Sequence, residues 1–313
     1  MKFEATREGF GRGLLQAGKK DASVVATSGD LNDSTHVDEF RNAFPERFVQ
    51  AGISEQNMVA MAAGLSMTGK VVFATSFGAF LPPRCLDQIR VSIALNNANV
   101  KLVATHCGVS TGEDGANAQM LEDIAVMRAL PNFTVIVPCD AVEARKATLA
   151  AAREKGPFYL RLGREKTQVV TSERDAFRAG KANVLREGSD VAIVACGIEV
   201  PFALQVAQKL KKQIDCKVIN LHTIKPIDEK AIEKAAKECG CIVTAEEHQI
   251  MGGMGSAVAE VVARKRPVPI EFVGVKDCFG ESGNAKELLE KYGLTQKFIE
   301  KAVRKAMERK REK

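Results

Sequence analysis

The sequence predicts an α/β protein built from two three-layer domains with mostly parallel sheets. Short apolar, β-branched runs alternate with helical segments over residues 1–165, and a second series of the same kind fills residues 190–313. Such alternation is typical of a parallel sheet with helices on both faces. Residues 166–189, between the two series, are polar and lack strong periodicity. We therefore expect domains at 1–165 and 190–313, joined by a linker at 166–189.

The elements follow from where apolar and β-branched residues cluster. The expected strands are 23–27, 47–50, 71–75, 101–105, 134–137, 158–162, 190–194, 216–220 and 241–245. The expected helices are 6–17, 37–43, one that begins near Ser54, 84–95, 122–129, 141–155, 200–211 and 229–238. A glycine-rich turn at 252–256 then enters another helix. We interpret this turn as close backbone packing, with anion binding at the helix N-terminus as the alternative.

The composition argues against a membrane or nucleic-acid protein. The 313 residues are 45% hydrophobic and 27% charged, which is ordinary for a globular domain. We find no apolar run near the roughly 20 residues of a membrane span and no signal core, so we expect a cytoplasmic protein. Much of the net charge of +6 lies in the tail 301–313, which is interpreted as the polar face of a helix. The eight cysteines form no C-x-x-C pair, so we expect reduced thiols.

One carboxylate, Glu55, stands between Ile53 and a long apolar helix. Met58, Ala62 and Leu65 recur at helical spacing behind it, so the first turn of this helix should be fixed by packing. A glutamate in a first turn is favoured by the helix dipole. From the residues alone, that structural role is the simpler interpretation of Glu55.

The blocks around and after Glu55 change this interpretation. They are 51–58 (AGISEQNM), 76–81 (SFGAFL), 86–90 (LDQIR), 105–115 (THCGVSTGEDG) and 121–125 (LEDIA). In this order and at these spacings they resemble the pyrimidine-binding domain of transketolase. The resemblance continues through 223–228 (TIKPID) and spans nearly all of the chain. It implies a thiamine diphosphate-dependent enzyme that transfers a two-carbon ketol unit between sugar phosphates.

The resemblance also implies a role for each matching residue. Glu55 corresponds to the carboxyl group that bonds to the pyrimidine ring nitrogen and favours the imino tautomer of the cofactor. Phe77 and Phe80 occupy the aromatic positions, with Phe80 as the stacking partner, and Asp30 matches an aspartate near the thiazolium end. The residues that match substrate contacts are Arg7, Ser34, His106, Asp114 and Arg164.

Two departures from the family pattern bear on substrate and partner. Ala118 stands where many transketolases carry histidine or glutamine, and Gln119 would replace that contact only if the backbone turned differently. The chain also has nothing like the Gly-Asp-Gly signature and later asparagine that supply the family's magnesium ligands. We therefore expect no metal ligands here. A separate N-terminal, diphosphate-binding subunit should hold Mg²⁺ and complete the enzyme, as an α2β2 heterotetramer.

Three alternatives stay open. The β subunit of a 2-oxo acid dehydrogenase shares the glutamate but does not need Arg7, His106 and Arg164. Deoxyxylulose phosphate synthase is another relative, which normally carries both cofactor domains in one chain. The third is a noncatalytic binding subunit that keeps the fold. The joint presence of Glu55, Phe80 and Asp114 counts against it, and Ala118 is the only point in its favour.

Overall fold

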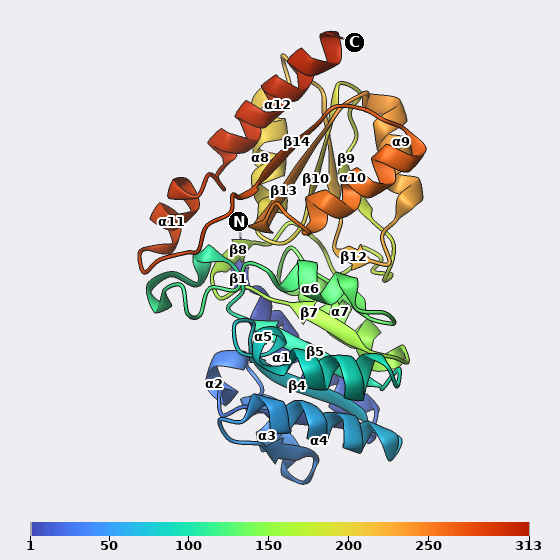
Figure 1. Cartoon of the computed structure of the whole chain (residues 1–313), viewed down its shortest axis with the longest axis vertical. Coiled ribbons are helices and arrows are strands. Elements are labelled where there is room, and N and C mark those ends of the chain that lie inside the picture. The colour runs from blue at the N-terminus through green and yellow to red at the C-terminus, as the bar shows by residue number, and fades with distance from the viewer. Residues whose placement is uncertain (1, 313) are drawn as a thin grey trace.

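The computed structural model describes residues 2–312, and two α/β units follow one another along its long axis (Figure 1). The sheet of the first unit has seven strands, and all neighbours run parallel except the outermost pair, β12 and β6. Across the sheet the strands are β12 (Thr223–Lys225), β6 (Thr134–Ile136), β7 (Phe158–Arg161), β5 (Val100–Thr105), β4 (Val71–Phe77), β2 (Val24–Ser28) and β3 (Phe48–Gln50). Every residue of β2 and β5 is buried, as expected of strands covered on both faces.

Helices cover both faces of this sheet. One layer contains α1 (Thr6–Lys20), α3 (Asp38–Ala43) and α7 (Ala141–Arg153), and the other contains α4 (Glu55–Met67), α5 (Pro82–Gln88) and α6 (Asp123–Ala129). Short helical turns complete the unit: α2 (Asn32–Thr35), η1 (Pro45–Arg47) and η3 (Val109–Asp114). The helix expected at 84–95 starts two residues earlier, because proline is tolerated in a first turn. Its second half, Ile89–Ala94, is π-helical.

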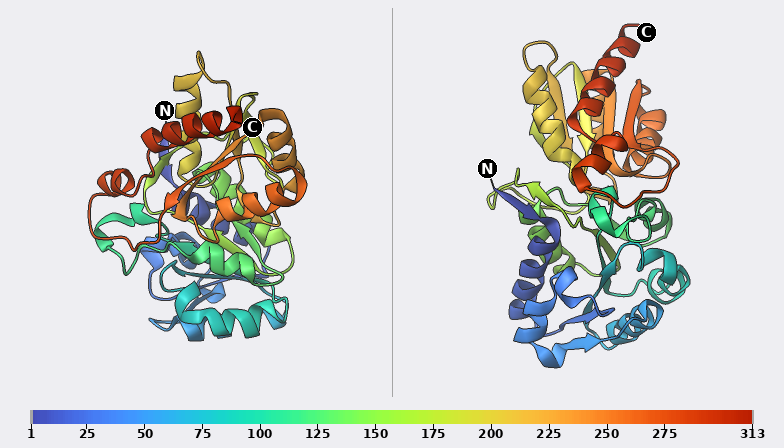
Figure 2. Two further views of the ribbon diagram at one scale, coloured as in Figure 1. Left: turned by 45° about the horizontal axis from the view of Figure 1, so that its top comes forward. Right: turned by 90° about the vertical axis from the view of Figure 1, so that its left-hand side faces the viewer.

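The second unit repeats the layered arrangement around a five-stranded sheet (Figure 2). Its strands, in order across the sheet, are β14 (Ile270–Val275), β13 (Ile242–Gln249), β10 (Val191–Ala195), β11 (Cys216–Asn220) and β9 (Asn183–Arg186). Its helices are α8 (Glu199–Leu210) and α12 (Gln296–Arg311) on one face, α9 (Glu229–Cys239) and α10 (Met254–Lys265) on the other, and α11 (Ala285–Lys291) beside η3. The predicted class of two mostly parallel α/β domains is confirmed.

The segment expected to be a linker contains two short strands. β8 (Lys166–Gln168) pairs antiparallel with β1 (Phe3–Ala5), so the start of the chain is held against the end of the first unit. β9 pairs antiparallel with β11 and closes one edge of the second sheet. Strands this short, with mixed burial, leave no alternating pattern in the sequence, which explains why the segment looks irregular.

The two units share a strand and an apolar core. β12 lies beyond the start of the second unit in sequence, yet it pairs with β6 at the edge of the first sheet. Val135 of β6, Ile224 of β12 and Val194 of β10 belong to one continuous cluster of buried apolar side chains. The second unit is therefore built onto the first, because part of each core is common to both.

The glycine-rich turn at 252–256 holds a carboxylate of the protein itself. The backbone N–H groups of Met254 and Gly255, in the first turn of α10, donate to the carboxylate of Glu246 at 2.6 and 2.8 Å. This contact supports the close-packing interpretation of the turn, because a buried side chain already occupies the helix N-terminus.

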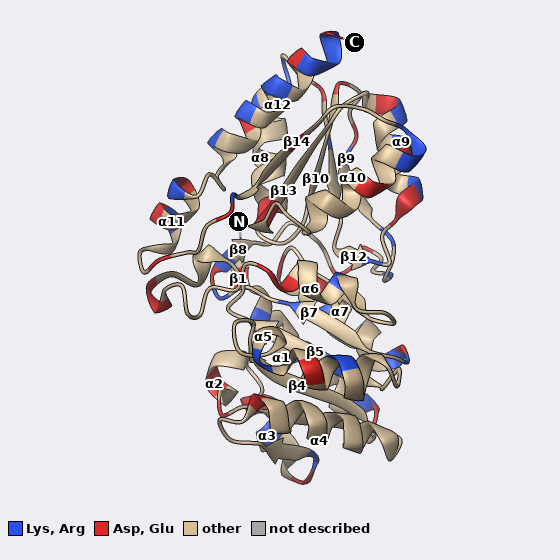
Figure 3. Ribbon diagram, viewed as in Figure 1, with Lys and Arg blue, Asp and Glu red and all other residues tan. Residues whose placement is uncertain are grey.

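The charged tail forms the outer face of α12. Figure 3 shows several lysine and arginine positions along this helix; Lys301, Arg304 and Lys305 are exposed, while Ile299 and Val303 are buried. Within residues 2–312, all eight cysteines are free thiols, and only Cys278 is exposed. None of the helices in this part of the chain is both long and apolar enough to cross a bilayer.

Candidate active site

Side chains from four parallel strands converge at one edge of the first sheet. Ser34 follows β2, Phe77 ends β4, His106 follows β5 and Arg164 follows β7. In α/β sheets, ligands bind outside the carboxyl ends of the strands. A hollow of about 780 Å³ lies at this edge. It is lined by Arg7, Glu8, Asp33, Ser34, His36, Phe77, Phe80, His106, Asp114, Asn117, Ala118 and Arg164. All predicted site residues are therefore on this lining except Glu55 and Asp30.

Two guanidinium groups give the hollow a positive wall. Arg7 Nη1 donates to the backbone oxygen of Ser34 at 2.9 Å. Arg164 Nη1 donates to the backbone oxygen of Thr111 at 2.6 Å and to the carboxylate of Glu113 at 3.1 Å. Burial, reinforced by the charge of Arg164, lowers the pKa of Arg7. Among the described residues no acceptor reaches the buried Nε of Arg7, so this wall retains an unused donor.

His106 is a neutral imidazole held in a fixed orientation. Its Nδ1 lies 2.9 Å from Thr105 Oγ1, and its ring stacks on Phe77 with centroids 3.7 Å apart. Burial lowers its pKa to about 3, and the nearby charges of Arg7 and Arg164 act in the same direction. At neutral pH the ring can donate one hydrogen bond and accept another without adding charge.

Three of the site positions have left-handed backbone conformations. The φ angles of Asp30, His36 and His106 are +66°, +59° and +57°. Such conformations are uncommon for residues with a side chain and concentrate at functional sites. The surrounding hydrogen bonds must therefore hold this edge of the sheet in shape.

Two phenylalanines form the apolar wall. The rings of Phe77 and Phe80 are 5.5 Å apart at an interplanar angle of 23°, and the Arg84 guanidinium lies 4.1 Å from the centroid of Phe80. Both rings are partly exposed to the hollow, so their faces are available to a flat ligand.

Glu55 lies behind this apolar wall. It is the first residue of α4 and is 5% exposed, so the helix N-terminus faces a buried carboxylate. Arg84 Nη1 lies 3.4 Å from both carboxylate oxygens and so connects Glu55 to Phe80. Arg84 is half exposed, and an ion pair of this kind contributes at most about 1 kcal/mol to stability. The contact leaves the carboxylate free to exchange partners.

Asp30 lies at the end of β2, outside the hollow. It is exposed, and its carboxylate accepts a hydrogen bond from Gln50. The neighbouring Gly29 packs against Glu55, since a Cβ built on it would stand 3.6 Å from Glu55 Cγ. The two predicted residues that do not line the hollow are thus close to one another.

The sequence did not identify His36, Glu8 or Asn117 as part of the lining. His36 follows Ser34 by two residues, and its pKa is lowered by burial and by Arg7. A polar residue close to a predicted contact is the only signal that could have indicated it. Arg84, which bridges Glu55 and Phe80, had no sequence signal of its own.

Ala118 lines the hollow, but Gln119 does not replace the missing contact. The Gln119 amide donates to the backbone oxygens of Val109, Gly112 and Glu281 at 3.3, 3.0 and 2.8 Å. All of its N–H capacity is used to support the backbone. The condition for a replacement is therefore not met, because the Gln119 side chain points into the protein and away from the hollow.

The site therefore combines a positive wall, an apolar wall and a buried carboxylate. Such a set can bind two molecules side by side: a small, hydroxylated molecule with an anionic end, and a second molecule with a flat ring. In the part of the chain that the structure describes, no group of three or more His, Cys, Asp or Glu side chains is placed to hold a metal ion.

Comparison with known proteins agrees with this arrangement. Residues 4–169 match the family model of the transketolase pyrimidine binding domain, and residues 180–299 match that of the transketolase C-terminal domain. A protein described as a transketolase C-terminal section from Methanocaldococcus jannaschii is 43% identical over 311 residues, which are 98% of each chain. The 6-deoxy-6-sulfo-D-fructose transketolase subunit SqwH of a Clostridium species is 42% identical over 298 residues, 95% of this chain and 92% of that one.

A solved structure gives the same result. The inactive β4 tetramer of a split gene transketolase superposes with a TM-score of 0.92 at 45% identity, covering 98% of this chain and 99% of that chain. By contrast, the chain spans about half the length of the transketolase-like proteins of mouse and cattle. With both family domains matched in succession, the chain belongs to the transketolase family, as a counterpart of its separate C-terminal subunits.

Proposed function

We propose that the chain, with a separate N-terminal subunit, transfers a two-carbon ketol unit between sugar phosphates. The observation that carries this proposal is the single hollow in which Arg7, His106 and Arg164 face an aromatic pair backed by Glu55. The positive wall suits the anionic end of a sugar, and Asp114, which lines the same hollow, would accept from a hydroxyl group. A 2-oxo acid dehydrogenase would have no use for that wall.

The residues present fit thiamine diphosphate as the cofactor. A buried carboxylate at a helix N-terminus and two parallel aromatic rings are the groups that an aminopyrimidine needs. Glu55 would hold the ring nitrogen, Phe80 and Phe77 would bound the ring, and Asp30 would lie towards the thiazolium end. When bound, thiamine diphosphate supplies a carbon nucleophile for the donor ketose.

The chain's own residues would then bind, orient and exchange protons. Glu55 shares a proton with the pyrimidine nitrogen, and its burial keeps water from competing for that proton. Arg7, Ser34 and Arg164 fix the anionic end of the substrate, while neutral His106 donates a hydrogen bond. Asp114 orients a hydroxyl group near the reacting carbon. These contacts hold the substrate carbonyl in place for attack.

The N-terminal subunit would supply Mg²⁺ and the diphosphate contacts. Exposed apolar side chains just before α4, on α5, and in and just after the π-helical segment lie on the same layer as Glu55 and support a docking surface for it. They are Ile53 (80% exposed), Leu86, Val91 and Leu95 (76% exposed). Large exposed apolar patches mark interaction sites, and we propose that these side chains belong to one. We propose that two copies of each subunit assemble as an α2β2 heterotetramer in the cytoplasm.

The first prediction tests subunit dependence. The purified chain alone should show no ketol transfer from xylulose 5-phosphate to ribose 5-phosphate, and activity should emerge on mixing with a diphosphate-domain subunit and Mg²⁺. The measurement is a coupled transfer assay across subunit ratios. Full turnover by the chain alone would rule out the split enzyme.

The second prediction concerns the positive wall. Arg164→Ala or His106→Ala should raise KM for phosphorylated sugars by about tenfold or more, because each charge-assisted hydrogen bond contributes about 1.5–3 kcal/mol. The matched control is Arg41→Ala. Arg41 is exposed and paired with Asp38 outside the hollow, so this substitution should leave KM unchanged. Unphosphorylated acceptors should be affected far less. An equal loss with both kinds of acceptor would contradict the assignment.

The third prediction concerns the protonation of His106. The pKa of His106 is about 3 in the folded chain, below the ordinary value of 6.5. Between pH 3 and pH 6.5 the folded chain therefore binds fewer protons at this residue than the unfolded chain. This residue therefore favours folding at neutral pH, and its contribution is lost as pH falls from about 6.5 towards 3. NMR titration of the isolated chain should show a neutral ring from pH 5 to 8. An inflection near pH 6.5 would show that the ring is not buried as described.

The fourth prediction is that Glu55→Gln slows proton exchange at the thiazolium carbon. Glutamine keeps the size but cannot share a titratable proton, so exchange and kcat should fall by about 10²- to 10⁴-fold in the assembled enzyme. Glu39→Gln, a first-turn glutamate of α3 outside the hollow, serves as the control. Deuterium exchange followed by NMR gives the rate. An unchanged exchange rate in Glu55→Gln would show that Glu55 takes no part in the chemistry and serves only in the first turn of its helix.

A further inference from the structure

The loop 108–115, here called the site loop, is held by the second unit of the chain. It follows His106 and carries Asp114, and its backbone receives the Arg164 side chain. Its helical turn η3 packs against α11 of the second unit. The geometry of the hollow therefore depends on contacts made from outside the domain that contains it.

Glu247, near the end of β13, makes the shortest of these contacts. Its Oε1 accepts the backbone N–H of Ser110 at 2.6 Å, and the side chain is almost fully buried. Gly108 lies directly against the carboxylate, since a Cβ there would stand 2.1 Å from the carboxyl carbon. Gly108 also has a φ of +96°, which favours glycine. The backbone can approach Glu247 this closely only because residue 108 has no side chain.

This hydrogen bond acts on the residues that shape the hollow. Thr111, next to Ser110, donates through Oγ1 to the backbone oxygen of His106 at 2.8 Å. The backbone oxygen of Thr111 accepts from Arg164 at 2.6 Å. Two side chains thus hold adjacent residues of the site loop. Glu247, in the second unit, binds Ser110, and Arg164, on the lining of the hollow, binds Thr111.

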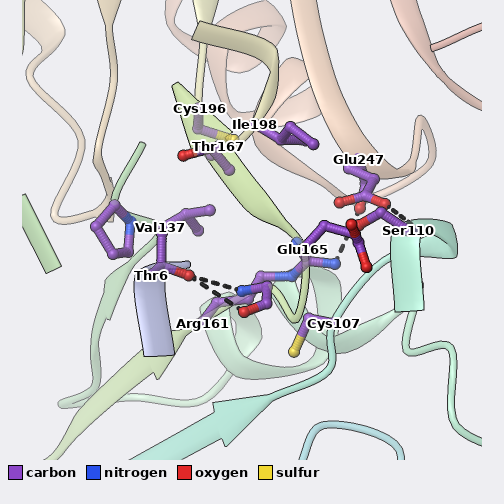
Figure 4. A pocket seen from close by; sticks show the side chains of 13 residues that line it. Thr6, Cys107, Ser110, Val137, Arg161, Glu165, Thr167, Cys196, Ile198 and Glu247 are labelled. Atoms are coloured by element: carbon purple, nitrogen blue, oxygen red, sulfur yellow. Dashed lines mark hydrogen bonds between the residues drawn. The ribbon is translucent and has the colours of Figure 1, made fainter. Parts of the chain in front are cut away.

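The base of the loop is fixed to the same strand. Arg161 Nη2 donates to the backbone oxygens of Met120 and Glu247 at 3.1 and 2.9 Å, and the Gly108 N–H donates to Met120 at 2.9 Å. In Figure 4, Glu247 and Ser110 face each other beside Arg161 and Cys107, around a cavity of about 20 Å³. A shift of Glu247 would therefore disturb the start of the loop at Gly108 and Ser110, and through Arg161 also Met120.

We propose that Glu247 is a positioning residue, which through Ser110 fixes the site loop so that His106, Asp114 and Arg164 converge on the substrate. This inference rests on the proposed function. It assigns to the C-terminal domain a direct part in substrate recognition, in addition to any part in assembly. A carboxyl group is suited to this role, because its oxygen accepts the Ser110 N–H in either protonation state and the bond is shorter and stronger when the group is ionised.

The neighbouring Glu246 provides a matched control. It is also buried, and burial raises the pKa of both carboxyl groups to about 7. Its carboxylate accepts from Met254 and Gly255 of α10, within its own domain. The two glutamates thus share strand, burial and chemistry but hold different segments.

The experiment compares Glu247→Ala, Glu247→Gln and Glu246→Ala. Hydrogen exchange of the isolated chain reports on the site loop, and kinetics of the chain mixed with its partner subunit report on the hollow. Glu247→Ala should speed amide exchange at Ser110 by about tenfold or more and raise KM for ribose 5-phosphate by a similar factor, with kcat changed much less. In Glu247→Gln, amide exchange at Ser110 and KM for ribose 5-phosphate should both stay close to the wild-type values, since the glutamine amide oxygen can accept from Ser110. Glu246→Ala should lower Tm without changing either readout.

Several results would overturn the proposal. Unchanged exchange at Ser110 in Glu247→Ala would show that the loop is not held by this contact. Faster exchange with unchanged KM would show that holding the loop does not position the substrate residues. An equal rise of KM in Glu246→Ala would show that the rise in Glu247→Ala comes from a general loss of stability and not from the site loop. A wild-type pair that transfers no ketol unit would refute the proposed function, and with it the part of the inference that concerns substrate, while exchange still tests the contact.

Discussion

The buried ion pair of Arg161 and Asp123 is the interaction on which the rest of the structure depends. Arg161 Nε lies 3.0 and 2.9 Å from the two carboxylate oxygens, and both side chains are withdrawn from solvent. Burying two charges is costly unless every remaining donor and acceptor finds a partner. Here Tyr159 donates to Asp123 at 2.7 Å, and the guanidinium reaches two backbone oxygens. Removing one partner of such a pair typically costs about 3–5 kcal/mol.

This pair lies at the end of one strand that leads into the site and close to the loop that carries Asp114. Arg161 ends β7, Asp123 begins α6, and the loop that carries Asp114 closes against them. His248 of β13 adds a further contact, since its Nε2 accepts the Ile124 N–H at 3.1 Å while burial lowers its pKa to about 4. A neutral histidine and a satisfied ion pair thus join the two units without an exposed charge.

Much of the fold and the composition of the site could be predicted from the sequence. Most of the longer strands are continuous apolar runs and most helices have regular spacing, so local pattern was sufficient to predict these elements. Motif order indicated Phe77, His106 and Arg164, which do line one hollow. These predictions succeed because the carboxyl ends of parallel strands necessarily meet at one edge.

The remaining features depend on contacts between residues far apart in the chain. Arg84 lies 29 positions after Glu55, and it connects the Glu55 carboxylate to the ring of Phe80. Gln119 turns inward because Glu281, 162 positions later, offers a backbone oxygen. β9 and β12 are too short for their pairing to be read from pattern. Side-chain direction and partner choice at such separations are decided by tertiary packing.

The late strand β12 has a consequence for how the protein is made. During synthesis, the first sheet keeps an open edge at β6 until residues 223–225 have left the ribosome, well into the second domain. An unpaired edge strand is a template for wrong pairing with other chains. A chain truncated before β12 would leave the β6 edge of the first sheet unpaired, in addition to the edge at β3.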